Sequence, residues 1–568
     1  MSYDLLLVNT HRQYGFENAI FRDWQGVHLL AAYMKENGYA VRVLSGFVHE
    51  ILPLLEAEIA AGVTVVGFAC DYENQDEVMQ LARHVRELRP LPVIVGGPQA
   101  VALGRDFLLR SGALAVVRGE GELPLLALMQ LLVDGSGRLE DIPGIVYLNE
   151  GQERRTPPPP PITRLDALPF SDPSLALVRP SLSPILPLLT ARGCPFRCSF
   201  CYEGGNTRSV RWRSVENVMR ELRQRLDADP RIRMVLFTDD AFTLNPRRVR
   251  EFCDALAAYR QKRDFGWFAE AHPRTLLMHP ELLPCMVEAG LVSLQIGVES
   301  GDARTLKAYN KKTTPAMIEE AVGICREAHL PHLVGNIIVG GAFETEESLA
   351  RSREFGLRLL EQGAGMLELH AIHFWPLPNT AMTLRPQDFG MEILDPASRT
   401  AVTDYPVVRC GDLSPERLSD LRADMDEAFK KRVCDLALQL PTAVVLRVMH
   451  CWHRYRQYSG YVDALSRVDR IRRFSLLLEQ GAVRRMDDIP PEEIGLWHPQ
   501  RQCPPLTRNG RHFAGDLPVD AGSYRVLVAS AGRMTVDEAA AHCGMARGDF
   551  LEAARRLEDC LALAFCRY

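Results

Sequence analysis

The sequence predicts an α/β protein with an N-terminal doubly wound parallel sheet, a partial (β/α)6 TIM-like barrel and a helical C-terminal region. Three observations favour this fold class. Short apolar runs alternate with helical patterns over residues 1–150, five consecutive prolines then interrupt the pattern, and a second alternation covers residues 184–380. Alternating strands and helices are typical of parallel sheets covered by helices, and the break between them predicts two separate sheets.

The N-terminal domain, residues 1–150, should bind ligands at the carboxyl ends of its strands, as doubly wound sheets do. Two predicted strands end in glycine-rich turns, Gly96-Gly97-Pro98 and Arg118-Gly119-Glu120-Gly121-Glu122. Glycine permits close approach of a ligand, although these glycines could equally form nothing more than tight turns. The predicted strands are residues 5–8, 41–44, 63–68, 93–95 and 113–117.

A proline-rich linker is predicted over residues 151–183, because the prolines at 157–161 favour an extended polyproline segment. The partial barrel follows over residues 184–380, and its active site should lie at the carboxyl ends of its strands. The predicted barrel strands are residues 185–190, 234–237, 267–269, 292–296, 333–338 and 366–373.

The strand signal disappears after the barrel. Residues 381–519 are predicted to form a mostly helical accessory region, with several amphipathic helices over 414–480. Residues 520–568 resemble a small winged-helix-like module in which Thr535 and Glu538 form a capping box. Such a module could capture a peptide, or it could be only a lid that packs on the barrel.

Composition excludes several function classes. The 568 residues contain 66 Lys plus Arg and 72 Asp plus Glu, a net charge of −6, which argues against a nucleic-acid partner. No apolar run approaches the length of a membrane span, so the sequence predicts a cytoplasmic protein. Most of the 14 cysteines lie singly in apolar helical stretches, where a small buried residue is the simplest explanation.

One group of cysteines is clustered. Cys194, Cys198 and Cys201 follow the first predicted barrel strand with C-x3-C-x2-C spacing, which puts them in a loop at the catalytic edge. Three thiolates at this spacing can hold three corners of a [4Fe-4S] cluster and leave one iron open for a small ligand. A structural zinc site would need a fourth protein ligand, and no nearby motif offers one.

This cysteine motif, with Phe200 before the last cysteine, resembles the signature of the radical S-adenosylmethionine (SAM) superfamily. The resemblance covers the predicted barrel, and it implies that SAM binds the open iron and is cleaved there to give a 5′-deoxyadenosyl radical. It also implies SAM contacts at other strand ends, although acids there could instead be helix caps or structural ion-pair partners. The implied contacts are Asp239 and Asp240 at the methionine amino group, and Gly297, Glu299, Ser300 and Gly340 near ribose and adenine.

The N-terminal domain resembles the cobalamin-binding domain of the cobalamin-dependent radical SAM enzymes, on the helix at 26–32 and the two glycine-rich turns. No histidine of the domain lies in a D-x-H-x-x-G loop, so we expect cobalt to lack a protein histidine ligand. The loop at 70–74 is the predicted surface below the corrin, and Cys70 there is more simply a buried thiol than a cobalt ligand. The implied cobalamin contacts are Asp71, Tyr72, Gly96, Gly97, Gly119, Glu120 and Gly121.

Glu270 and His272 end the third predicted barrel strand and are the candidate catalytic residues. Either could orient the substrate, and His272 could serve as a base. The alternative is a strand-end pair that only bonds to neighbouring loops. His370 and His373 lie near the end of the sixth strand, and an aromatic-rich helix at 449–461 could line a pocket or, more simply, belong to the core.

The combined resemblance implies a cobalamin-dependent radical SAM methyltransferase that methylates an unactivated carbon of a natural-product or peptide substrate. Such a carbon is not nucleophilic enough for ordinary methyl transfer from SAM. The implied cofactors are a [4Fe-4S] cluster, SAM and cobalamin, and the implied partner is an electron donor such as flavodoxin or ferredoxin. Two alternatives stay open: the same cofactors used for ring contraction, cyclisation or oxidation, and a cobalamin-binding sensor or structural partner.

Overall fold

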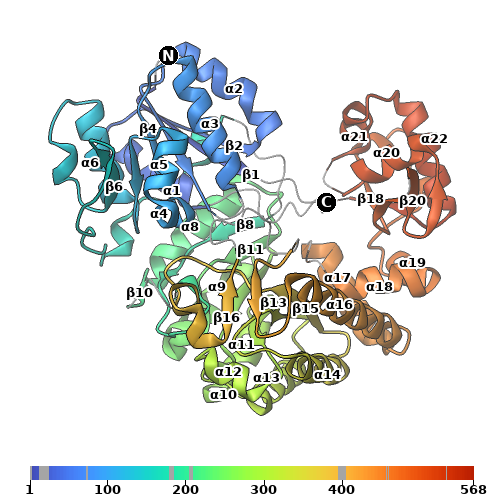
Figure 1. Cartoon of the computed structure of the whole chain (residues 1–568). Helices are drawn as coiled ribbons and strands as arrows, with labels where there is room; N and C mark the ends of the chain where they lie inside the picture. The colour runs from blue at the N-terminus through green and yellow to red at the C-terminus, as the bar shows by residue number, and fades with distance from the viewer. Residues whose placement is uncertain are drawn as a thin grey trace.

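A computed structural model describes the chain over residues 3–11, 25–71, 74–177, 185–203, 209–394, 405–455, 457, 459–508, 510–532 and 534–567 (Figure 1). Within these residues the chain forms an N-terminal sheet domain, a second sheet domain, a helical region and a small C-terminal unit. The N-terminal domain lies directly against the second sheet domain (Figure 1).

The N-terminal sheet has seven strands in the order β2-β1-β3-β4-β5-β6-β7. The first five are parallel, as predicted, and the last two are antiparallel additions. Glu150 and Gly151 join β6 to β7 with φ of 52° and 75°, which suits a two-residue hairpin turn. The strands are β1 Leu5–His11, β2 Val41–Phe47, β3 Val65–Ala69, β4 Val93–Gly96, β5 Ala115–Val117, β6 Ile145–Asn149 and β7 Gln152–Arg155.

Helices cover both faces of this sheet, so the doubly wound prediction is confirmed. Alternate residues of β1 face opposite cores: Leu5 and Leu7 pack toward one set of helices, and Leu6 and Val8 toward the other. The first set is α1 Gln25–Glu36 and α6 Glu122–Leu132. The second set is α2 Val48–Ala61, α3 Gln75–Leu88, α4 Pro98–Leu103 and α5 Arg105–Ser111, and a short 3-10 turn η2 spans Leu139–Asp141.

The linker is bound to both domains along the part that the structure describes. Its proline run begins on the N-terminal sheet domain, where Gly144 N donates to Pro157 O over 2.7 Å. Asp166 then accepts from Ser214 N of the second domain over 2.8 Å, and Leu177 N returns to Val43 O of β2 over 2.8 Å. Two 3-10 turns, η3 Leu165–Ala167 and η4 Pro173–Leu175, lie within it.

The second domain is a six-stranded parallel sheet in the order β15-β14-β13-β12-β11-β8, so each strand pairs with its neighbour along the chain. This is the strand order of a partial barrel, and all six predicted strands are confirmed. The strands are β8 Ile185–Leu188, β11 Met234–Phe237, β12 Gly266–Ala271, β13 Leu291–Glu299, β14 His332–Val339 and β15 Leu367–His373.

Helices cover the outer face of this sheet, and a short ladder of β9 Ala191–Arg192 with β10 Arg211–Trp212 follows the first strand. Outward residues such as Trp267, Leu294 and Leu333 are fully buried in one large core. The helices are α8 Val215–Ala228, α9 Pro246–Arg260, α10 Pro273–Met278, α11 Leu282–Glu288, α12 Ala303–Ala308, α13 Pro315–Glu327 and α14 Glu346–Gln362, with a 3-10 turn η5 over Phe242–Leu244.

The last third of the chain begins with α15 Ala381–Leu384, η6 Pro386–Phe389 and an unpredicted ladder of β16 Met391–Ile393 with β17 Val408–Cys410. The predicted amphipathic helices then follow. In α17 the side chains of Cys451 and Tyr455 pack against Met234 and Val292 at the amino-terminal side of the barrel strands. These helices are α16 Pro415–Ala437, α17 Thr442–Tyr455, α18 Gly460–Val468 and α19 Arg470–Glu479.

The last unit has its own core, which starts at Met486 rather than at residue 520, because β18 pairs with the final strand β22. The predicted capping box is confirmed: Thr535 N donates to the Glu538 carboxylate over 2.8 Å, and the Thr535 hydroxyl accepts from Glu538 N over 3.3 Å. No helix among the residues described is both long and apolar enough for a membrane span. The elements are η7 Met486–Asp488, η8 Ile494–Leu496, β18 His498–Arg501, β19 Pro505–Arg508, β20 Arg511–Ala514, β21 Leu517–Val519, α20 Ala521–Ala529, α21 Val536–His542, α22 Arg547–Asp559 and β22 Leu563–Cys566.

Candidate active site

The loop that carries the three cysteines is held by the turn after α12. Ser199 N donates to Tyr309 O over 2.9 Å, and the Ser199 hydroxyl donates to Ala308 O over 3.0 Å. Asn310 Nδ2 donates to Arg197 O over 2.7 Å on the same side of the loop. A loop fixed by three such bonds holds its side chains in place before any ligand binds.

The three thiols lie close enough to influence one another. Burial raises the pKa of Cys194 to about 11 and that of Cys198 to about 12, and Cys201 adds to both shifts. Lys311 opposes the shift at Cys198. Cys194 and Cys198 are buried, and Cys201 is half-buried. The three sulfur donors thus lie in one loop, beside the positive charge of Lys311.

A buried ion pair lies next to this loop. Lys311 Nζ is 2.8 Å from Glu299 Oε1, and both side chains are buried. Although burial opposes it, the charges of Glu299 and Cys198 raise the pKa of Lys311. Gly297 leaves the space for this pair, since a Cβ there would lie 2.1 Å from the Glu299 oxygen and 2.2 Å from the Lys311 nitrogen. Gly297 is therefore required by close packing rather than by a turn.

His272 is fixed by backbone groups. Its ring stacks on Phe196 of the cysteine loop with centroids 3.8 Å apart, and Nε2 lies 2.9 Å from Lys311 O. Nδ1 accepts from Arg274 N at the start of α10 over 3.2 Å, so the ring hydrogen is on Nε2. Burial lowers the pKa of His272 to about 3, and Lys311 adds to this shift. This geometry suits a residue that positions the cysteine loop.

Two carboxyl groups at neighbouring strand ends have strongly raised pKa values. Burial, with a contribution from Asp240, raises the pKa of Glu270 to about 7. Asp240 lies at the end of β11 with part of its side chain exposed. Desolvation of the remaining part, together with the charge of Glu203, raises its pKa to about 7. Groups with pKa values near neutrality can donate or accept protons at working pH.

Asp239 is buried and supports the start of the cysteine loop. Its Oδ1 accepts from Thr190 N over 2.7 Å and from Ala191 N over 2.9 Å, and its Oδ2 accepts from the Thr190 hydroxyl. Arg248 donates to Thr190 O over 2.9 Å from the next helix. Both carboxylate oxygens are thus engaged by the strand that leads into Cys194.

The turn after β14 is stabilised by a residue that sequence reasoning missed. Gly340 N and Gly341 N donate to Glu344 Oε2 over 2.6 and 2.9 Å. A Cβ at Gly341 would lie 1.7 Å from the Tyr309 hydroxyl oxygen, so only glycine fits there. Ser300 instead bonds to Ser352 of α14 over 3.0 Å and is buried. The Gly-Gly-x-x-Glu spacing is the signal that could have identified Glu344.

The predicted cobalamin edge is formed by the turns after β3, β4 and β5. Gly97 has φ of 121°, and a Cβ there would lie 2.0 Å from Cys70 O, so the two turns touch through glycine. Asp71 Oδ1 accepts from Asn74 N over 3.1 Å and shapes its own turn, while Tyr72 lies outside the described residues. Around Gly119 nothing lies within 4 Å of an added Cβ. This edge thus presents bare backbone to a flat ligand.

The carboxyl edges of the two sheets face each other. Arg211 of β10 donates to Glu120 over 3.0 Å, and Arg192 of β9 donates to Glu122 over 2.5 Å. Although partial burial opposes it, the two arginines lower the pKa of Glu120. At the end of β11, Thr238 donates to Gln25 at the start of α1 over 3.3 Å. These contacts put Glu120 between the domains and bring the cysteine loop toward the glycine-rich turns.

Comparisons with known proteins agree with this division. The radical SAM superfamily model matches residues 188–356, and the B12 binding domain model matches residues 23–129. The two matched segments coincide with the partial barrel and with the N-terminal sheet domain. The radical SAM domain implies a [4Fe-4S] cluster and SAM as cofactors, and the B12-binding domain implies cobalamin.

Two curated relatives show how far the similarity in sequence extends. The chain is 32% identical over 289 residues to an uncharacterised methyltransferase of Pyrococcus horikoshii, covering 50% of this chain and 61% of the relative. It is 28% identical over 266 residues to the anaerobic magnesium-protoporphyrin IX monomethyl ester cyclase of Cereibacter sphaeroides, covering 45% and 43%. The chain thus spans less than two thirds of either relative.

The fold is similar to that of a cobalamin-dependent S-adenosylmethionine radical enzyme, OxsB, solved with aqua-cobalamin and S-adenosylmethionine bound. The TM-score is 0.61 at 17% identity, and the match covers 84% of this chain and 72% of OxsB. At this identity the likeness shows the fold alone. It confirms the predicted order of a cobalamin-type sheet domain, a partial barrel and further helices.

The radical SAM domain fits its implied cofactors. Three loop cysteines supply the thiolates that a [4Fe-4S] cluster needs. In the described part of the chain no group of three His, Cys, Asp or Glu side chains is arranged to hold a single metal ion. The B12-binding domain offers the glycine edge at Gly97 and Gly119. The predicted cofactor contacts fall into two groups. Near the cysteine loop lie Asp240, Glu270, Gly297 and Glu299. Hydrogen bonds to other residues of this chain engage Asp239, Ser300 and Glu120.

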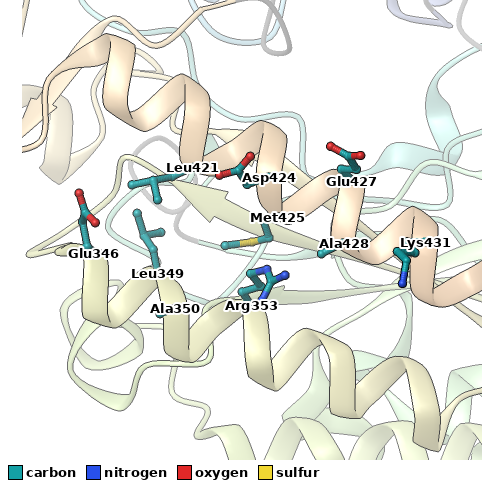
Figure 2. A pocket seen from close by; sticks show the side chains of 10 residues that line it. All are labelled: Glu346, Leu349, Ala350, Arg353, Leu421, Asp424, Met425, Glu427, Ala428 and Lys431. Atoms are coloured by element: carbon teal, nitrogen blue, oxygen red, sulfur yellow. The ribbon is translucent and has the colours of Figure 1, made fainter.

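The cavity in Figure 2 lies elsewhere. It holds about 450 Å³ and is formed by α14 and α16 on the outside of the barrel. None of its side chains comes from a strand end, and charges of both signs, including Glu346 and Lys431, surround it. It is separate from the site built on the cysteine loop.

Proposed function

We propose that the protein is a cobalamin-dependent radical SAM methyltransferase that methylates an unactivated carbon. The observation that carries the proposal is the contact between the two carboxyl edges, Arg192 with Glu122, Arg211 with Glu120 and Thr238 with Gln25. These contacts support the proposal, because they join the turn after β5 and the start of α1 to the segments next to the cysteine loop. A reaction that needs both cofactors on one substrate requires this arrangement.

The cofactors supply one-electron cleavage of SAM and a cobalt that carries a methyl group, and the protein's residues position them. Cys194, Cys198 and Cys201 hold the cluster. The Lys311–Glu299 pair fixes opposite charges beside it, and His272 supports the loop through its stack on Phe196. Glu270, on the inner face of β12, is the proposed proton donor or acceptor, since its pKa of about 7 makes both forms available at neutral pH.

Product stoichiometry tests the methylation proposal. With methyl-labelled SAM and the true substrate, we expect labelled product, S-adenosylhomocysteine and 5′-deoxyadenosine in about equal amounts, because the proposed reaction consumes two SAM molecules. Mass spectrometry of timed samples measures all three. The Cys434→Ala variant, changed at a half-buried helix cysteine outside the loop, should behave as the wild type.

The cyclase relative favours a second candidate, in which the radical drives cyclisation, ring contraction or oxidation. Such reactions need no methyl donor. Product with 5′-deoxyadenosine but without S-adenosylhomocysteine would therefore replace the methyltransferase proposal by this one. Purified protein that binds cobalamin but cannot be loaded with iron would instead favour the sensor or structural role.

We also propose that an acidic one-electron donor, such as flavodoxin or ferredoxin, docks over the cysteine loop. Four exposed basic side chains lie on or beside the segments that hold it: Arg197, Arg274, Lys307 and Lys312. The double variant Arg274→Glu/Lys307→Glu should slow cluster reduction by flavodoxin about tenfold at low salt, and added salt should slow the wild type. Stopped-flow absorbance measures the rate.

The control for donor docking is the double variant Lys430→Glu/Lys431→Glu on α16, which exposes the same charges away from the loop. Flavodoxin should reduce the cluster of this variant at the wild-type rate. Dithionite, a small reductant, should reduce all forms at one rate. Equal slowing with dithionite, or no slowing with flavodoxin, would contradict the docking surface. A small-molecule or peptide substrate and a cytoplasmic, reducing location belong to the same proposal.

A further inference from the structure

One row of residues crosses the inner face of the barrel close to the candidate active site. Gly297 pairs with Asn336, and Asn336 pairs with His370, in the parallel ladders of β13, β14 and β15. Neighbouring strands lie about 4.8 Å apart, so the His370 backbone is about 10 Å from Gly297. His370 thus lies on the same sheet as the Glu299–Lys311 pair, two strands from Gly297.

The inner face is accessible there. Along β14 and β15, outward residues such as Leu333 and Leu369 are buried, whereas Val334, Asn336 and His370 are partly exposed. The side chain of His370 is 41% exposed. The other side of the sheet is covered by helices, so this exposure belongs to the interior of the partial barrel.

A buried carboxylate orients His370. Its Nε2 lies 3.2 Å from Glu368 Oε1, and Glu368 is buried. Glu368 Oε2 is held by Gly460 N over 2.8 Å and by His332 Nε2 over 3.2 Å. Gln457 Nε2 donates to His332 Nδ1 over 3.1 Å, so His332 carries its hydrogen on Nε2 and donates it to Glu368. A buried carboxylate held in this way needs a cation, and His370 is placed to be one.

The surrounding charges favour the protonated form of His370. Although burial opposes it, Glu368 raises the pKa of His370, and Asp426 of α16 adds to the shift while Lys430 of α16 reduces it. When protonated, His370 donates Nε2–H to Glu368, and its Nδ1–H can donate to another acceptor. Among the residues described, no protein group accepts from Nδ1, and none bonds to the Asn336 amide on the next strand. Two neighbouring donors therefore face the interior of the barrel.

We propose that His370 and Asn336 bind a carboxylate group of the substrate inside the barrel. A cationic imidazole and an amide N–H are the donors that suit a carboxylate, and each charge-assisted hydrogen bond is stronger than a neutral one. Glu368 is the positioning residue, because it acts only through His370. This proposal rests on the proposed function for the location of the substrate, but it concerns which substrates bind and not which reaction follows.

Binding of matched probes tests the site without turnover. Octanoate and octanamide differ only in the group that His370 would bind, and calorimetry with the full-length protein measures both affinities. We expect octanoate to bind more tightly than octanamide, and the His370→Gln variant to weaken octanoate about tenfold or more while leaving octanamide unchanged. The His370→Lys variant keeps the charge and should restore most of the octanoate affinity.

The pH profile and a matched control distinguish binding from a structural role. Glu368 raises the pKa of His370, so octanoate affinity should fall as pH rises through that pKa, and Glu368→Gln should move the fall to lower pH. The His84→Gln variant removes a half-exposed histidine paired with Glu56 on α2, outside the barrel, and should have no effect. Thermal melting confirms that each variant is folded.

Three results would overturn the site: no octanoate binding to the wild type, equal affinity for octanamide, or unchanged octanoate affinity in folded His370→Gln. Failure of the methylation experiment would leave these results intact, because the probes need neither SAM nor a loaded cluster. Loss of carboxylate binding would likewise leave the product stoichiometry unaffected. The two proposals can therefore fail separately.

Discussion

Replacement of Cys194, Cys198 and Cys201 together by alanine removes the iron–sulfur cluster and leaves cobalamin binding intact. The three thiols lie in one loop of the radical SAM domain, whereas the glycine edge belongs to the B12-binding domain. Without thiolates no protein group in the loop can hold iron. Iron analysis and visible absorbance of the reconstituted variant measure the loss, and cobalamin retained on gel filtration measures the second site.

The loss of 5′-deoxyadenosine formation in this variant should be complete within detection. The Cys434→Ala variant is the control and should keep both cofactors. Cluster absorbance that persists in the triple variant would show that other residues hold iron and would refute the assignment of the loop. Simultaneous loss of cobalamin would show instead that the two sites depend on each other for folding.

Replacement of Gly297 by alanine destabilises the protein by about 1–3 kcal/mol, because the added methyl group overpacks a buried region. The added methyl group would lie 2.1 Å from Glu299 Oε1 and 2.2 Å from Lys311 Nζ, so the ends of both buried side chains must move. Movement of either side chain weakens this buried ion pair, and water cannot replace the lost contact. Denaturant unfolding followed by fluorescence measures the change in the free energy of unfolding.

Gly323→Ala is the matched control for this change. Gly323 lies inside α13, where the nearest atom to an added Cβ is Gln362 Nε2 at 3.4 Å. Alanine is favoured in a helix by about 1 kcal/mol over glycine, so this variant should be as stable as the wild type or more so. If Gly297→Ala unfolds like Gly323→Ala, the Glu299–Lys311 pair does not fill the space that the structure gives it.

The parallel strands could be predicted from sequence because each is a short apolar run between helical patterns. The β6–β7 hairpin could not, since β7 is almost entirely polar and lies at the edge of the sheet, where it has no buried face. The ladder of β16 with β17 was missed for a related reason. Its strands are three residues long and too short to show a period.

Some residues of the candidate site could likewise be predicted from the sequence, and others could not. The cysteine loop was predictable because its spacing is local in sequence. Lys311 was not, because it meets Glu299 only after α12 folds back, and nothing in a single lysine marks it as buried. Glu120 looked like part of a ligand-binding turn, and its contact with Arg211 depends on how two domains pack, which no local pattern records.

The linker bears on how the two cofactor sites work together. Its backbone bonds to the N-terminal sheet domain at Pro157 and again at Leu177. Between these two points the Asp166 side chain accepts from Ser214 of the barrel domain, so the linker ties the two domains along its described part. A loose tether would leave the two sites to meet by diffusion, at a concentration set by tether length. A tether that is bonded along its course removes that search. The loss of entropy that accompanies bringing the two domains together occurs once, during folding. The two halves of the site therefore meet in each catalytic cycle without a further loss of entropy.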